Sequence, residues 1–232
     1  MRLLGIETSS RRGSVALVQD DRVIALRHHE APSAHRENML RLVQQALGDA
    51  GWERSALDRI AVGVGPGSFT GLRVGVALAQ GIALGLGIPL VGIDSLRAMA
   101  AAAPQDRPGA RWALVDAHRN EVFVAAFSEE GAVLCPVQAV ARAAVAAMIE
   151  GHGSGPRLVL GEIAAEVAPG PEVLRGFETD LPMASQVALL GHLAPAPTNP
   201  VEPMYARPAD AIVPDLPPSP LAAPLDNPGG VR

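Results

Sequence analysis

Lysine is absent from this sequence, because all 19 of its Lys and Arg positions among 232 residues are arginine. The lysine of P-loop nucleotide sites and the amine of Schiff-base chemistry are therefore excluded. Cysteine occurs once, as Cys135, which excludes an internal disulfide framework and fits a reducing cytoplasm. The first apolar run, residues 3–6, has the length of a strand and ends at Glu7, so we expect no secretion leader and a cytoplasmic protein.

Metal-ligand patterns are absent as well. The six histidines are dispersed, and the adjacent His28 and His29 would point to opposite faces of a strand. Neither a His-Glu-x-x-His motif nor paired cysteines and histidines occur. We therefore expect neither a metal site nor a cofactor.

The overall composition is that of a globular protein, with 48% hydrophobic and 19% charged residues. The formal net charge of −5 argues against a free-standing nucleic-acid binder, which normally presents a basic face. It leaves open a subunit of an RNA-modifying assembly whose partners supply that face.

The most informative segment is a glycine-rich turn, residues 63–71, between a buried strand at 60–64 and a helix. The helix carries a small residue at every fourth position: Gly71, Gly75, Ala79, Ala83 and Gly87. Each interior glycine costs up to about 1 kcal/mol relative to alanine, so close packing against a neighbour must compensate. We predict that this small-residue face receives a partner helix.

A membrane span over residues 74–93 is the alternative, since Gln80 is its only strongly polar side chain. Gly85, Gly87 and Pro89 should break the helix before that length is reached, leaving residues 88–93 as a short buried strand. We expect no membrane association.

The order of elements predicts an α/β fold with mixed sheets flanked by helices. The expected strands are 3–7, 14–19, 22–29, 60–64, 88–93, 112–116, 121–128, 132–136 and 157–160, and the expected helices are 34–50, 71–87, 95–103, 139–150, 163–167 and 184–192. Residues 112–116 repeat the pattern of 3–7, an apolar strand ending in a carboxylate, which indicates a duplicated lobe. We predict lobes at 1–104 and 105–207, and a disordered Pro-rich tail at 208–232.

Two polar turns, at residues 7–9 and at residues 65–68, are candidate phosphate sites. Glu7, Thr8 and Ser9 end the first strand, where hydroxyl and N–H groups can meet a phosphate or can simply cap a hairpin. Asp116 ends the corresponding strand of the second half and could pair with Glu7 across a cleft. The turn at 65–68 fits neither the dinucleotide nor the Walker pattern, so a helix cap by Ser68 or Thr70 is the favoured interpretation.

Several segments together carry a family resemblance. Residues 4–9 (LGIETS) and 65–75 (GPGSFTGLRVG) are its strongest parts, and residues 79–84, 89–93, 116–123 and 202–207 extend it. The sequence resembles the TsaB family, small actin-like (ASKHA, ribonuclease H-like) proteins of the machinery that forms N6-threonylcarbamoyladenosine at position 37 of tRNAs.

The resemblance implies a non-catalytic subunit that dimerises with and activates the catalytic relative TsaD, with the ATPase TsaE as a second partner and tRNA bound only within the complex. The metal ligands of TsaD match Ser95 and Met99 here, and neither suits such a metal. No catalytic residue is therefore expected. The implied partner interface lies on two helices: Met39, Leu42, Val43, Gly71, Val74, Gly75, Leu78, Ala79 and Ala83.

Other interpretations stay open at this point. An ATP-binding actin-fold enzyme would use Glu7, Thr8, Ser9 and Asp116 around phosphate, and a metallo-glycoprotease-like hydrolase is the other catalytic alternative. A homodimer through the same two helices competes with pairing to TsaD, because both would use one surface.

Overall fold

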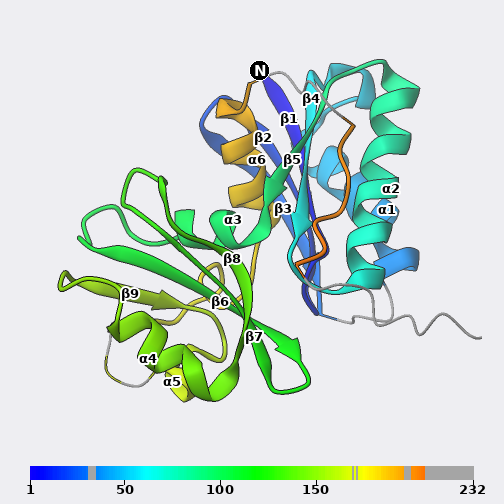
Figure 1. Cartoon of the computed structure of the whole chain (residues 1–232). Coiled ribbons are helices and arrows are strands. Elements are labelled where there is room, and N and C mark those ends of the chain that lie inside the picture. Colours follow the sequence, from blue (N-terminus) through cyan, green and yellow to red (C-terminus); the bar gives the residue numbers. More distant parts are fainter. Residues whose placement is uncertain (31–34, 169, 171, 196–199, 207–232) are drawn as a thin grey trace, which may run out of the picture.

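A computed structural model describes residues 1–30, 35–168, 170, 172–195 and 200–206. Two five-stranded sheets stand side by side, each with helices on both faces (Figure 1). The α/β class and the arrangement in two lobes of mixed sheets are confirmed. The lobe boundaries at 104 and 207 stay a prediction, and the predicted tail at 208–232 lies outside the described residues.

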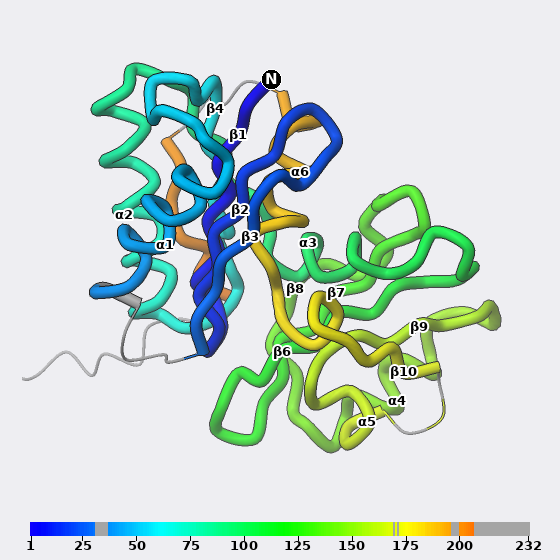
Figure 2. Tube along the Cα trace, turned by 180° about the vertical axis from the view of Figure 1, so that it is seen from behind, coloured from blue at the N-terminus to red at the C-terminus, as the bar shows by residue number. Residues whose placement is uncertain are grey.

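The first sheet has the order β3-β2-β1-β4-β5. Its strands are β1 (Arg2–Glu7), β2 (Gly13–Gln19), β3 (Arg22–His29), β4 (Arg59–Gly65) and β5 (Leu90–Asp94). Side chains alternate along β1, so Leu4 packs toward helices α1 (His35–Ala50) and α2 (Phe69–Leu86), whereas Leu3 packs toward α6 (Ala184–Leu193). Figure 2 shows the resulting three layers, with α6 on the face opposite α1 and α2.

The second sheet repeats this plan, in the order β10-β9-β6-β7-β8. Its strands are β6 (Ala110–His118), β7 (Glu121–Phe127), β8 (Val133–Ala141), β9 (Arg157–Leu160) and β10 (Glu172–Leu174). Strand β6 runs antiparallel to β7 and parallel to β9, as β1 does to β2 and β4. Helix α3 (Ser95–Ala101) covers one face, and α4 (Val145–Glu150) and α5 (Ala164–Val167) cover the other.

Two predicted elements need correction. The helix expected over 139–150 begins only at Val145, because residues 139–141 extend β8 and pair with β7. Alanine favours a helix, but residues 139–141 pair with the edge of β7, and this tertiary pairing overrides the local propensity. Strand β10 was not predicted, since three residues are too few to show a period.

Helix α2 is long and apolar enough to cross a membrane by length and composition alone. A continuous span over 74–93 does not form, however, because Gly87 ends the helix in the left-handed region at φ 66° and β5 begins at Leu90. Its buried residues pack on the first sheet beside α1, as in the core helix of a globular lobe.

The small-residue face of α2 does not receive a partner helix, so that part of the prediction is wrong. Gly71, Gly75, Ala79 and Ala83 are buried within this chain. A Cβ atom at Gly75 would overlap the hydroxyl of Thr8, and one at Gly71 would overlap the carbonyl oxygen of Thr8. The small face therefore brings α2 close to the end of β1.

Two glycines of α2 in opposite environments test this packing. Replacing Gly75 with Ala should destabilise the isolated chain by about 1–3 kcal/mol, because the added methyl group is forced onto Thr8. Replacing Gly81 with Ala should stabilise it by up to about 1 kcal/mol, because no atom lies within 4 Å of the new Cβ. Urea unfolding of both variants measures the difference, and equal free energies of unfolding would contradict the packing described.

Candidate functional site

The turn that follows β1 is buried and is bonded to the glycine-rich loop. The hydroxyl of Thr8 donates to the carbonyl oxygen of Gly71 at 2.8 Å, and the N–H of Ser68 donates to the carbonyl oxygen of Ser9 at 2.7 Å. A Cβ atom at Gly67 would overlap Ser9, so glycine is required for this approach. Both donors therefore already have acceptors within the protein, and neither points into an open anion site.

Ser68 caps α2, as the sequence favours. Its hydroxyl oxygen accepts from the N–H of Gly71 at 3.2 Å. An N-cap of this kind satisfies a backbone donor that the first helical turn leaves without a partner. The cap interpretation of residues 65–68 is therefore confirmed.

Glu7 lies at the centre of a fully buried polar network. Its Oε1 atom accepts from the N–H of Ser9 at 2.6 Å, and its Oε2 atom accepts from the hydroxyl of Ser95 at 2.8 Å. Ser95 in turn accepts from the N–H of Gly65 at 3.1 Å. Burial raises the pKa of Glu7, and the hydrogen bonds from Ser9 and Ser95 oppose that rise.

Ser95 and Met99, which match metal ligands in the implied catalytic relative, are both fully buried. The Ser95 hydroxyl is engaged with Glu7, and Met99 belongs to the apolar core of the second lobe. Within the part of the chain that the structure describes, no group of three or more His, Cys, Asp or Glu side chains could hold a metal ion.

Asp116 lies on the second sheet and has partners of its own. Its Oδ1 atom accepts from the N–H of His118 at 2.9 Å and lies 3.4 Å from Arg142 Nη2. Glu7, Thr8 and Ser9 form one turn, whereas Asp116 is bonded within a different lobe. Glu7, Thr8 and Asp116 are bonded within the fold, whereas the buried hydroxyl of Ser9 has no hydrogen-bond partner among the described residues. A nucleotide site made by the four residues stays a prediction.

The nine predicted interface residues divide into two sets. Seven are buried and packed within the first lobe: Met39, Leu42, Val43, Gly71, Gly75, Ala79 and Ala83. Val74 and Leu78 are half-buried and line an open groove of about 490 Å³ between α1 and α2. Met39 also lines this groove, although its side chain is almost fully buried.

Residues missed by the sequence analysis complete this surface. Leu40 is 51% exposed and Phe69 is 49% exposed, and both line the groove with Ala77. Further along α2, Leu84 is 86% exposed. We call Leu40, Phe69, Val74, Ala77, Leu78, Gly81, Leu84 and Gly85 the α1/α2 face. Phe69 lay in a motif already noted, but its exposure could not be read from the sequence.

Gly81 and Gly85 stand out on this face because nothing in the described structure explains them. No atom lies within 4 Å of a Cβ built at either position, and neither has a positive φ. Each nevertheless weakens the helix by up to about 1 kcal/mol relative to alanine. When neither packing within the chain nor backbone conformation requires a glycine on an exposed apolar helix, the glycine is consistent with close approach by another molecule.

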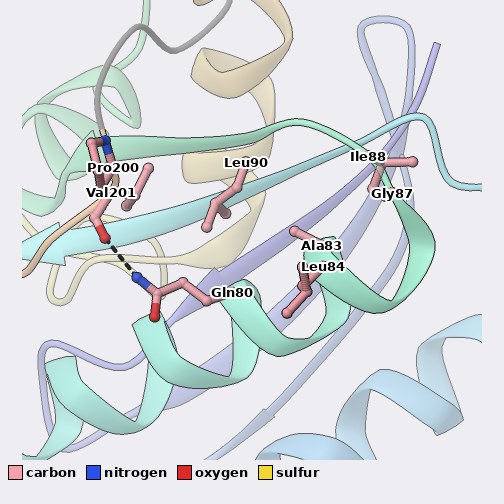
Figure 3. Close-up of a pocket in the computed structure, with 8 residues that line it drawn as sticks. All are labelled: Gln80, Ala83, Leu84, Gly87, Ile88, Leu90, Pro200 and Val201. Carbon is pink, nitrogen blue, oxygen red and sulfur yellow. Dashed lines mark hydrogen bonds between the residues drawn. The ribbon is translucent and has the colours of Figure 1, made fainter.

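A second groove, of about 460 Å³, lies on the other flank of α2 (Figure 3). It is bordered by Leu84, Ile88 and Leu90 and by the extended segment that contains Pro200 and Val201. The amide of Gln80 donates to the carbonyl oxygen of Val201 at 2.9 Å and holds that segment beside the helix.

The chain is similar to known proteins of one family. Residues 28–188 match the family model described as TsaD, tRNA N6-adenosine threonylcarbamoyltransferase. The chain is 39% identical over 132 residues to the "tRNA threonylcarbamoyladenosine biosynthesis protein TsaB" of Escherichia coli strain K12, a match that covers 56% of this chain and 56% of that protein. The match thus spans about half the length of this curated relative.

Solved structures support the fold. YeaZ from Pseudomonas aeruginosa is 28% identical, with a TM-score of 0.70 over 83% of this chain and 90% of that one. A ROK hexokinase from Thermus thermophilus, 12% identical, aligns with a TM-score of 0.51 over 83% of this chain and 99% of the hexokinase. The second likeness concerns the fold alone and is in keeping with the predicted actin-like architecture.

The buried Glu7 predicts a specific pH dependence. Because the folded state binds its proton more tightly than the unfolded state does, the free energy of unfolding should fall as pH rises above about 4.3, the ordinary glutamate value, until the raised pKa is passed. Replacing Glu7 with Gln removes this titration. The melting temperature of the variant relative to the wild type should therefore increase from pH 4 to pH 7.

Glu130 provides a control of opposite sign, because the hydroxyl of Ser128 lowers its pKa. The stability that Glu130 contributes is present above the ordinary glutamate value and is lost at lower pH. Relative to the wild type, Glu130→Gln should therefore lose stability as pH rises from acid to neutral. The same slope for both variants would contradict the assignment for Glu7.

Proposed function

Because the chain belongs to the TsaD family of tRNA N6-adenosine threonylcarbamoyltransferases, we propose that it is the non-catalytic, dimerising and activating subunit in the formation of N6-threonylcarbamoyladenosine at position 37 of tRNAs. The name of the E. coli relative supports this role. The match covers about half of that relative, so activity, substrate and partners are assigned to this chain as proposals.

The buried network around Glu7 supports a non-catalytic role. The family resemblance matches Ser95 and Met99 to metal ligands of the enzyme, yet Ser95 is bonded to Glu7 and Met99 packs in the core. Neither side chain offers a group that would hold the expected metal. Chemistry is accordingly assigned to the partner.

The α1/α2 face, which no described residue covers, is the observation on which the proposal depends. Its exposed apolar side chains and its two glycines, Gly81 and Gly85, suit close contact with a helix layer. The family match begins at residue 28 and includes both helices, so a catalytic member of the family carries a related pair. We therefore assign the face to pairing with a TsaD-type subunit.

Other parts of the assignment follow from this role. TsaE is proposed as the ATPase of the assembly, and the cytoplasm as its location. Since the net charge is −5, tRNA is expected to bind only within the complex, where other subunits supply the basic surface. A homodimer through the same α1/α2 face is the competing arrangement.

Enlarging Gly81 tests the pairing surface. Gly81→Leu should leave the isolated chain folded, because the position is open and leucine is a good helix former. In the complex the side chain is forced into a close contact, at a cost of about 1–3 kcal/mol. The dissociation constant for the TsaD-type subunit of the same organism, measured by calorimetry, should rise by roughly ten- to a hundredfold.

The matched control is Ala147→Leu, an exposed small residue on α4 in the second lobe. It should leave the dissociation constant unchanged. Pairing of Gly81→Leu with wild-type affinity would remove the α1/α2 face as the partner surface.

A second test concerns catalysis. The purified chain alone is expected to form no threonylcarbamoyladenosine from threonylcarbamoyl-adenylate and tRNA, because Ser95 and Met99 cannot replace the metal ligands. Product is measured by mass spectrometry of digested tRNA. Turnover by the isolated chain at the rate of the assembled complex would rule out the non-catalytic role.

A further inference from the structure

Residues 200–206 form an extended segment, here called the strap, that runs along α2 beside β4 and β5 (Figures 1 and 3). Two hydrogen bonds fix it: the amide of Gln80 donates to the carbonyl oxygen of Val201 at 2.9 Å, and the N–H of Met204 donates to the carbonyl oxygen of Val64 at 2.7 Å. Val201 also packs against the apolar core of the first lobe. The strap is thus tied to both the helix and the sheet.

At its end the strap places Tyr205 against two residues of the first turns of α2. The Nε atom of Arg73 donates to the Tyr205 hydroxyl at 3.2 Å, and the Arg73 guanidinium lies 3.8 Å from the centre of the Phe69 ring. The rings of Phe69 and Tyr205 are 5.2 Å apart at an interplanar angle of 38°. Phe69 and Tyr205 remain 49% and 48% exposed, so this cluster lies at the surface.

The cluster borders the groove between α1 and α2. Among the described residues that line this groove, Arg73 is the one with a charge, and Thr70 is the other polar side chain. An apolar groove with one cation at its rim complements an apolar helix that carries a carboxylate. Aromatic and arginine side chains are also the types that most often dominate binding energy at protein interfaces.

The contacts within the cluster already hold its side chains in place before a partner binds, which lowers the entropy cost of binding. Phe69 and Arg73 are long, exposed side chains that would otherwise lose rotamer freedom when a partner arrives. Stacking on Phe69 and the bond to Tyr205 restrict Arg73 in the free protein. The strap therefore supplies one member of the cluster and restrains the other two.

We propose that Tyr205 completes the partner surface by holding Phe69 and Arg73 as a preformed anchor for a helix of the TsaD-type subunit, which brings a carboxylate to Arg73. This inference rests on the proposed function and adds to it a role for the C-terminal strap. Tyr205 acts as a positioning residue, whereas Phe69 and Arg73 make the direct contacts.

The test compares three variants of the full chain, binding the TsaD-type subunit of the same organism in calorimetry at low and high salt. Tyr205→Ala should weaken binding by at least tenfold. Tyr205→Phe keeps the ring against Phe69 but loses the bond to Arg73, so it should weaken binding by a smaller, intermediate factor. Arg73→Met keeps an unbranched apolar stem but removes the guanidinium, and it should bind at least tenfold more weakly, with a smaller salt dependence than the wild type.

Melting temperatures of the isolated variants identify any loss of folding, and Val133→Ala, an exposed site on β8, is the control that should bind normally. If the wild type does not bind the TsaD-type subunit, the proposed function fails and the anchor fails with it. If the wild type binds while Tyr205→Ala and Arg73→Met bind equally well, the anchor alone is overturned. Weakening of self-association by Tyr205→Ala, with unchanged binding to the TsaD-type subunit, would also overturn it.

Discussion

The contact between the end of β1 and the first turns of α2 is the constraint on which the rest of the first lobe depends. The hydroxyl of Thr8 donates to the carbonyl oxygen of Gly71. Thr8 lies so close to α2 that no side chain fits at Gly71 or Gly75. This contact brings the helix against the sheet, so the inner side of α2 is used completely by the lobe. Any contact of α2 with another molecule must therefore be made by its outer side.

The same contact gives the polar groups at the end of β1 a structural role. In open α/β sheets the carboxyl ends of strands are the usual place for a phosphate, because free N–H groups gather there. In this chain the N–H of Ser68 is bonded to Ser9, and the carboxylate of Glu7 accepts from Ser9 and Ser95. These hydrogen bonds hold the turn and the loop together.

Local sequence was sufficient for most elements of the fold: strand 22–29 is marked by the turn residues before it, and helix 34–50 by its apolar face. The spacing of small residues on α2 predicted a close approach correctly but could not say what approaches, since a turn of the same chain and a partner helix both need room. The cluster of Phe69, Arg73 and Tyr205 could not be predicted from the sequence, because Tyr205 is 132 residues from Arg73 along the chain. Only the fold of the strap brings them together.

If the α1/α2 face is the partner surface, pairing with a second copy and pairing with a TsaD-type subunit exclude each other. A homodimer of two-fold symmetry would place each face against itself, so the Arg73 of each copy would have to find a carboxylate on the other. The groove offers none among its described lining residues, whereas a different chain is free to supply one. Charge complementarity at Arg73 therefore favours pairing with a different chain over pairing with a second copy.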